Sequence, residues 1–280
     1  MKSWHMIIDV ARCHDCNDCF LADKDEFVDN EFPPYSAAQP WHGHRWMHIK
    51  RKERGQFPIV RVAYLPMPCM HCEEAPCLTM DGAVYRREDG LVLIDPLKAK
   101  GRKEIVASCP YSAIYWNEEA QLPQKCTGCA HLLDDGWTET RCSQVCPTDA
   151  VKLVLAEEGE MAALAAEQGL RRYRDGLGTR PRVWYRNLHC WDKAFIGASL
   201  VFADTDECAA GAAVTVTACG RVAGRGESNA FGEFIVDGLD PGAEYDVTVE
   251  AAGYEPATCA VKLDASLNIG TVLLEKLQMT

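Results

Sequence analysis

The sequence lacks a membrane-spanning segment, an excess of positive charge and a recognisable export signal. No run approaches the roughly 18 apolar residues that a spanning helix requires. The 41 acidic residues outnumber the 29 basic ones, and the net charge of −12 argues against sequence-independent nucleic-acid binding, which needs a positive surface to neutralise phosphates. Met1–Val10 has no apolar segment like that of a secretory leader. We therefore expect a soluble, cytoplasmic protein.

The cysteine content does not fit a disulfide scaffold. Such scaffolds are usually short secreted chains, whereas this chain has 280 residues and an odd total of 15 cysteines. Its length suits two domains, and its composition, 48% hydrophobic and 25% charged, indicates a folded protein. Metal ligation is the better explanation for the thiols.

The first cysteine group lacks its last member. Cys13, Cys16 and Cys19 have the spacing C-x₂-C-x₂-C. Bacterial ferredoxins extend this motif by x₃-C, and the fourth thiolate then binds a different [4Fe–4S] cluster from the first three. Here Asp23 occupies the fourth position. The motif therefore predicts a cluster site together with an unusual ligand.

Three more groups follow along the chain. The second, C-x₂-C-x₄-C, has no fourth cysteine, and the third keeps only its last position, followed by proline. The fourth, C-x₂-C-x₁₂-C-x₃-C-P, is complete; alone it would also suit zinc, but beside the other groups it favours iron–sulfur ligation. These groups are, in order, Cys69, Cys72 and Cys77; Cys109; and Cys126, Cys129, Cys142 and Cys146.

Ligand exchange between loops, as in two-cluster ferredoxins, pairs the groups in one consistent way. The second group offers three thiolates and the third offers one, which together complete a cluster, while the converse site lacks all four ligands. A whole cluster has therefore been lost, and the first and fourth groups pair with each other. The predicted ligand sets are Cys13, Cys16, Cys19 and Cys146 for cluster one; Asp23, Cys126, Cys129 and Cys142 for cluster two; and Cys69, Cys72, Cys77 and Cys109 for cluster three.

The role of Asp23 has three interpretations. In the first, its carboxylate binds the fourth iron, as a harder ligand than thiolate. In the second, Asp23 does not bind that iron, and water or hydroxide does. In the third, the site holds a [3Fe–4S] cluster, which lacks that iron. We favour direct ligation, with Asp25 as an outside candidate. About twelve irons per chain are expected, or about eleven with a three-iron cluster.

The fold class indicated by the rest of the chain is α+β. Residues 1–157 are expected to form a ferredoxin-like domain with three clusters, residues 158–196 a helix-and-strand connector, and residues 197–280 a small antiparallel β-sandwich with no catalytic features. The remaining cysteines have no ligand spacing and are expected to be buried small hydrophobes: Cys190, Cys208, Cys219 and Cys259.

The polar, aromatic and proline-bearing stretch Asp25–Arg54 is expected to be an irregular excursion over the cluster domain. His42 and His44 lie within it at i, i+2 spacing, without a cysteine nearby. Surface or partner contacts are therefore favoured over metal binding for both histidines.

The four cysteine groups, in this order and with two Cys-Pro endings, resemble the iron–sulfur subunits of the dimethyl sulfoxide reductase family of molybdenum enzymes. Within that family, Pro68-Cys-Met-His-Cys, Tyr115-Trp-Asn-Glu-Glu and Ala130-His-Leu-Leu-Asp-Asp are similar to small subunits of polyphenol transhydroxylases. The similarity covers nearly the whole chain. In the tail, Phe231-Gly-Glu-Phe and Ala252-Gly-Tyr resemble transthyretin-like and carboxypeptidase-regulatory domains.

This resemblance implies a large catalytic partner that carries molybdenum on a bis-pterin guanine dinucleotide, in a heterodimer or multiples of it. It implies hydroxyl transfer between polyphenols, or reductive removal of a catechol hydroxyl, with no catalytic residue in this chain. It also implies anaerobic life and leaves open co-export with a signal-bearing partner.

Two function classes stay open. The chain is an electron relay, or it is a structural and docking subunit, because net hydroxyl transfer needs no external electrons. A stand-alone ferredoxin is disfavoured by the extra loops and the sandwich.

Overall fold

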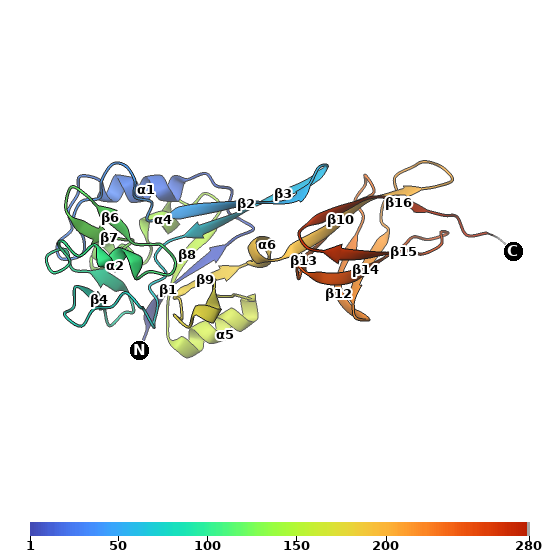
Figure 1. Ribbon diagram of the computed structural model, residues 1–280. Helices are drawn as coiled ribbons and strands as arrows, with labels where there is room; N and C mark the ends of the chain where they lie inside the picture. The colour runs from blue at the N-terminus through green and yellow to red at the C-terminus, as the bar shows by residue number, and fades with distance from the viewer. Residues whose placement is uncertain (279–280) are drawn as a thin grey trace. The chain divides into compact units, whose positions relative to one another are not determined.

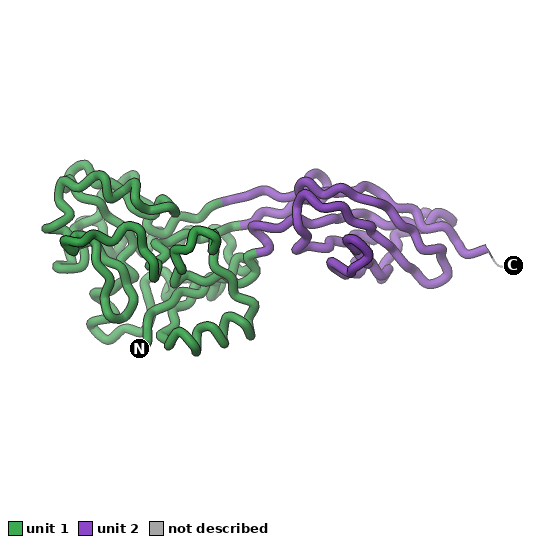
Figure 2. Tube along the Cα trace, turned by 60° about the horizontal axis from the view of Figure 1, so that its bottom comes forward, with its two compact units in different colours: residues 1–50, 64–188 green, residues 51–63, 189–280 purple. Residues whose placement is uncertain are grey.

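The computed structural model describes residues 1–278, which form the two compact units coloured in Figure 2. Unit 1 comprises Met1–Lys50 and Tyr64–Leu188, and unit 2 comprises Arg51–Ala63 and the chain from His189 onward. The chain therefore contributes to unit 2 twice. Among the described residues, no helix is both long and apolar enough to cross a lipid bilayer.

Unit 1 consists of short elements joined by the loops that carry the cysteine groups (Figure 1). Its elements, including the hairpin whose tip belongs to unit 2, are β1 (Ser3–Asp9), α1 (Asp18–Phe27), β2 (His48–Gln56), β3 (Ile59–Met67), β4 (Val84–Arg86), β5 (Val92–Ile94), α2 (Glu104–Ala107), β6 (Tyr115–Asn117), β7 (Leu122–Gln124), α3 (Ala130–Asp134), α4 (Arg141–Gln144), β8 (Val151–Ala156), α5 (Glu158–Gln168), η1 (Asp175–Leu177) and β9 (Val183–Arg186).

The central sheet of unit 1 has the order β8-β1-β9, with β1 antiparallel to β8 and parallel to β9. Helix α5 buries Met161 and Ala165 in a core that includes Ile7 of β1. Gly169 ends the helix with φ of 63°, a left-handed conformation that costs glycine little. The helix, its acidic first turn and the strands on either side of it were expected from the sequence.

The stretch between the first two cysteine groups is more regular than expected. Helix α1 continues to Phe27, and β2 begins at His48, so within Asp25–Arg54 only residues 28–47 lack a regular helix or strand, apart from isolated bridges such as those at Val28 and Phe32. The charged sequence of β2 shows no apolar alternation, and its strand is stabilised instead by main-chain pairing with β3.

Unit 2 is almost entirely β. Its described part, up to residue 278, contains seven strands after the short helix α6 (His189–Asp192). They are β10 (Ala194–Phe202), β11 (Ala213–Ala218), β12 (Arg221–Glu227), β13 (Glu233–Leu239), β14 (Ala243–Glu250), β15 (Ala257–Leu263) and β16 (Leu267–Leu274).

These strands form two sheets, β13-β10-β16 and β12-β11-β14-β15, over one hydrophobic core. Leu200 and Phe234 come from the first sheet, and Val216 and Val247 from the second, and all four are buried. One pairing corrects the expectation of a wholly antiparallel arrangement, because β10 and β16 run parallel. The strands of the second sheet, together with β13, supply the long crossover that a parallel pair requires.

The tip of the β2–β3 hairpin is built into unit 2. Arg54 is 5% exposed and donates two hydrogen bonds to the carboxylate of Asp237, at 3.0 and 2.5 Å. Gly55 has φ of +84°, and a Cβ there would lie 2.4 Å from the Ile59 carbonyl oxygen and 2.5 Å from the Phe195 ring. Only glycine fits this position without displacing the backbone.

Candidate iron–sulfur centres

The first predicted site lies in the loop between β1 and α1 and in the loop after α4. Asp15 and Asn17 adopt positive φ values of 58° and 65°, so the chain turns sharply around the first cysteines. Burial raises the pKa of Cys13, and the charges of Cys16 and Cys146 raise it further. Because the charges of Cys16 and Cys146 act on Cys13, these three thiols lie close together. In α1, Cys19 follows directly after the first helical residue.

Cys146 differs from the other thiols of this site. Burial raises its pKa, but hydrogen bonds from Thr148 and from main-chain N–H groups outweigh burial and lower the pKa overall. The N–H of Ala150 lies 3.3 Å from its Sγ. Donors directed at sulfur stabilise the thiolate, which is the form that binds metal.

The cysteines predicted for cluster three line one small cavity. Tyr111 and Lys125 lie among its other lining residues. Burial raises the pKa of Cys72 to about 12 and that of Cys77 to about 11, and the charge of Cys69 contributes to both shifts. The cysteines that line this cavity are Cys69, Cys72, Cys77 and Cys109.

The ligands predicted for cluster two line a second cavity, with Phe27 and Trp46 among the other lining residues. Main-chain N–H groups of Gly128 and Arg141 each lie 3.4 Å from a thiol sulfur, and the hydroxyl of Thr140 lies 3.1 Å from another. The four ligand candidates in this cavity are Asp23, Cys126, Cys129 and Cys142.

Asp23 is a buried carboxyl, 8% exposed. Burial raises its pKa to about 7, against the hydrogen bond from Gln39 and the charge of Lys24. The Nε2 of Gln39 donates to Oδ2 of Asp23 at 3.2 Å. An ionised carboxylate at such a position needs a compensating positive charge, and a cluster iron would provide one.

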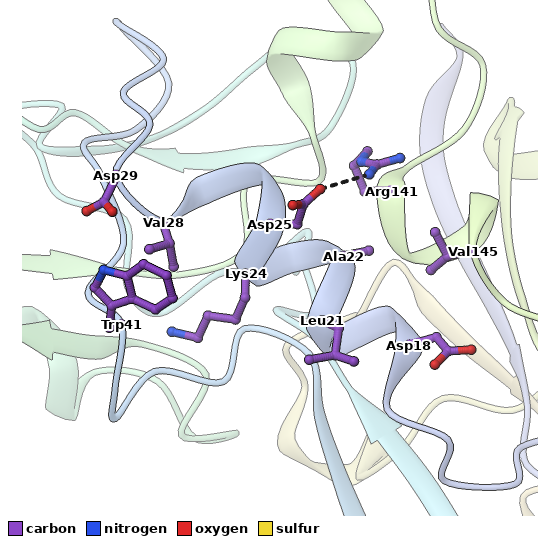
Figure 3. Close-up of a pocket in the computed structure, with 10 residues that line it drawn as sticks. All are labelled: Asp18, Leu21, Ala22, Lys24, Asp25, Val28, Asp29, Trp41, Arg141 and Val145. Atoms are coloured by element: carbon purple, nitrogen blue, oxygen red, sulfur yellow. Dashed lines mark hydrogen bonds and ion pairs between the residues drawn. The ribbon is translucent and has the colours of Figure 1, made fainter.

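Asp25, the outside candidate, faces another way. It lies on a surface groove of about 810 Å³, where its carboxylate is 3.5 Å from the guanidinium of Arg141 (Figure 3). The same groove exposes Leu21 and Trp41, and no thiol lines it. The groove therefore has no iron–sulfur ligand of its own.

The Asp23 cavity neighbours both other sites. Burial raises the pKa of Cys142, and the charge of Cys19 adds to the shift. Burial also raises the pKa of Cys126 to about 12, and the charges of Asp23 and Cys69 add to it. Because Cys19 belongs to the first predicted set and Cys69 to the third, the Asp23 site is adjacent to both.

This chemistry suits iron–sulfur clusters. The eleven cysteines among the predicted ligands are free thiols, and the twelve predicted ligands gather in three groups of four. Buried thiols with raised pKa values are poor metal ligands until they lose their protons, so cluster binding at these sites is coupled to proton release. Thiolates are soft ligands, and iron–sulfur clusters with tetrahedral iron are held by sets of cysteine thiolates of this kind.

Outside the three groups, the structure corrects one expectation. None of the four remaining cysteines is fully buried: Cys190 and Cys259 are half-buried, and Cys208 and Cys219 are exposed. Cys219 lies in the turn between β11 and β12, and Cys208 lies in the connection after β10, where it forms an isolated bridge with Val201. Cys190 lies near His189 and Asp237, although Asp237 is also paired with Arg54. His44 is buried and hydrogen-bonded to the Trp116 carbonyl at 3.0 Å, while His42 is exposed.

Several residues around the cavities were not identified from the sequence. Gln39 is far from any cysteine group, and no local pattern indicates it. Lys125 directly precedes Cys126, and His71 lies inside the second group. The sequence therefore shows that both residues are next to predicted ligands, but it does not show that both are buried.

The fold and the three thiol groups define an iron–sulfur protein, and residues 60–156 match the family model described as a 4Fe-4S dicluster domain. The chain is 45% identical over 278 residues to the pyrogallol hydroxytransferase small subunit of Pelobacter acidigallici, covering 98% of this chain and all of that one. It is 30% identical to a thiosulfate reductase electron transfer subunit of Salmonella typhi, covering 61% of this chain and 85% of that one. The iron–sulfur cluster-binding subunit of a menaquinone reductase from Nitratidesulfovibrio vulgaris is 27% identical, over 67% of this chain and 90% of its own. The chain belongs to the family of small iron–sulfur electron-transfer subunits of molybdenum enzymes.

Proposed function

We propose that this chain relays electrons through three iron–sulfur clusters to or from a molybdenum-containing catalytic subunit that acts on polyphenols. The observation that carries the proposal is the gathering of twelve predicted ligands at three adjacent sites. Full-length similarity to the pyrogallol hydroxytransferase small subunit supports the substrate class.

The ligand sets would be those derived from the spacing of the cysteines. Cys13, Cys16, Cys19 and Cys146 would hold cluster one, and Cys69, Cys72, Cys77 and Cys109 would hold cluster three. Asp23 would complete cluster two beside Cys126, Cys129 and Cys142. The clusters supply one-electron redox chemistry when bound; this chain's own residues exclude water from the sites and direct N–H groups at the thiolates.

The catalytic site would lie in the large subunit, on a molybdenum bis-pterin guanine dinucleotide. Removal of a catechol hydroxyl as water consumes two electrons and two protons, so that reaction requires a relay. Hydroxyl transfer from one polyphenol to another is balanced without external electrons. A structural role for the clusters is therefore the second candidate.

We also propose the finer domain arrangement. Residues 1–157 would form the ferredoxin-like domain, residues 158–196 a connector, and residues 197–280 a transthyretin-like sandwich. Support comes from the 4Fe-4S family match within the first segment and from the two sheets that share a core in the last.

The deciding experiment is anaerobic purification of the tagged chain from its native host, with identification of the protein that copurifies and its molybdenum content. The complex is then mixed with pyrogallol or a catechol and frozen during turnover for EPR. A relay predicts that at least one cluster signal changes redox state at the turnover rate. Clusters that stay in one state while substrate is consumed would favour the structural role.

A further inference from the structure

Lys125 is an ammonium buried between two of the predicted sites. It is 3% exposed, and its Nζ donates to the main-chain carbonyls of Val92 and Cys126, the latter at 3.1 Å. Both acceptors are uncharged, so neither neutralises the ammonium. A buried charge of this kind is costly unless an opposite charge lies close to it.

The position of Lys125 indicates where the opposite charge would be. Its backbone adjoins Cys126 of the Asp23 site, but its side chain lines the cavity of the neighbouring site, with Cys69, Cys77 and Cys109. A cluster on four thiolates carries net negative charge. Lys125 would therefore face a cluster that its own loop does not ligate.

His71 shows the converse arrangement. It lies between Cys69 and Cys72 in sequence and is 6% exposed. Its Nδ1 accepts the N–H of Val92 at 3.0 Å, so the ring proton must be on Nε2. Nε2 is buried without a hydrogen-bond partner among residues 1–278. A Cβ built on Gly128 would lie 3.5 Å from it, so this N–H is next to the loop between Cys126 and Cys129.

We propose that Lys125 and His71 form a crossed pair, each tuning the cluster held by the other's loop. Lys125 offsets the charge of the cluster on Cys69, Cys72, Cys77 and Cys109, and His71 donates a hydrogen bond to sulfur at the Asp23 site. Val92 holds both residues, because its carbonyl accepts from Lys125 and its N–H donates to His71.

The expected effect is a higher reduction potential at both sites. The reduced cluster carries one more negative charge, which a nearby cation or N–H donor stabilises. This inference rests on the ligand sets of the proposed function.

The test is an EPR-monitored redox titration of the anaerobic complex. Lys125→Met should shift the midpoint of the cluster on the Cys69 set to more negative potential, with about a tenfold lower reduced-to-oxidised ratio at a fixed potential, about 59 mV for one electron. His71→Phe, which keeps a ring but loses the donor, should shift the Asp23-site cluster. The cluster on the Cys13 set should not move in either variant.

Controls use the same substitutions at exposed positions. Lys98→Met and His42→Phe should leave all midpoints unchanged. Lys125→Arg keeps the charge and should retain a midpoint near the wild-type value if the enlarged side chain is accommodated. If every Lys125 variant loses its clusters, the His71→Phe shift decides the proposal.

Two results would separate this inference from the proposed function. Full iron content with unmoved midpoints, or a shift of the wrong cluster in each variant, would overturn the crossed pair while leaving the relay intact. Wild-type complex with fewer than three clusters would instead overturn the ligand sets.

Discussion

Asp23 and Cys19 show how one helix serves two sites at the scale of single residues. They are four residues apart on α1, so both side chains lie on the same face of the helix. Cys19 belongs to the first predicted set, while Asp23 lines the cavity of the next. The spacing of the motif predicted this division, but not the burial of Asp23 or its hydrogen bond from Gln39, which depends on a loop sixteen residues away.

Replacing Asp23 with cysteine should alter one cluster and leave two unchanged. A thiolate in place of a carboxylate gives that site four sulfur ligands and a changed EPR signal. The measurement is EPR of the reduced complex, with iron content near twelve atoms in both proteins. Asp25→Cys is the matched control, because Asp25 is exposed on the groove beside Arg141. Identical spectra for wild type and Asp23→Cys would remove Asp23 from the ligand set.

His5 should make unit 1 sensitive to mild acid. Burial lowers the pKa of His5 from 6.5 to about 4, and Trp184 donates to its Nδ1 at 3.4 Å. The unfolded chain therefore binds the proton more readily than the folded chain does. The contribution of neutral His5 to the free energy of unfolding is complete above pH 6.5 and is lost as the pH falls toward 4. Between pH 7 and pH 5 the loss should be about 2 kcal/mol.

The measurement for His5 compares unfolding midpoints at pH 7 and pH 5. His5→Gln should flatten the difference, whereas His42→Gln, at an exposed position, should not. An equal decline in wild type and His5→Gln would assign the acid sensitivity to other groups.

At the scale of elements, α4 depends on its cap. Thr140 accepts the N–H of Ser143, and the Ser143 hydroxyl accepts the N–H of Thr140 at 2.9 Å, which forms a capping box in front of Cys142. The Thr140 hydroxyl also lies 3.1 Å from the Cys142 sulfur. A four-residue helix has little stability of its own, so the cap holds the thiol in place.

Thr140→Ala should destabilise α4 by about 1 kcal/mol and speed loss of the Asp23-site cluster. The measurement is the rate of iron release to a chelator, followed by the EPR signal of each cluster. Thr140→Ser should resemble wild type, and Thr138→Ala, at an exposed position, should have no effect. Equal release rates in Thr140→Ala and wild type would show that the cap does not support the site.

Elements with a clear pattern were predictable, and those held by distant contacts were not. The strands of unit 2 follow alternating apolar residues, and α5 follows its acidic first turn and Gly169. Strand β2 was missed because His48–Gln56 is mostly charged and depends on pairing with β3. The parallel pairing of β10 with β16 was missed because periodicity does not report which strands become neighbours.

At the scale of the whole molecule, the assignment of the four cysteine groups to ligand sets predicts three clusters and no fourth. Iron analysis of the anaerobic complex should give about twelve irons per chain, and about eleven if the Asp23 site holds three. A value near sixteen would contradict the loss of a cluster. Colorimetric iron and acid-labile sulfide, measured on the same sample, provide the check.

Removing the clusters should affect the two units unequally. The predicted ligands all lie in unit 1, whereas unit 2 has a separate hydrophobic core. Chelator under oxidising conditions should therefore abolish amide protection in β1, β8 and β9 while β11 and β14 stay protected. Hydrogen exchange by mass spectrometry measures both at once. Equal loss of protection in both units would show that unit 2 depends on the metal.

The hairpin tip has a consequence for the order in which the protein is made. Arg51–Ala63 leaves the ribosome before Tyr64–Leu188, and the rest of unit 2 emerges only afterwards. The hydrogen bond from Arg54 to Asp237 and the packing of Gly55 against Phe195 can therefore form only after the whole metal-binding unit has been synthesised. The second unit is thus not an appendage that a gene fusion could transfer from residue 189 onward, because one of its pieces, Arg51–Ala63, precedes most of the metal-binding unit in the sequence.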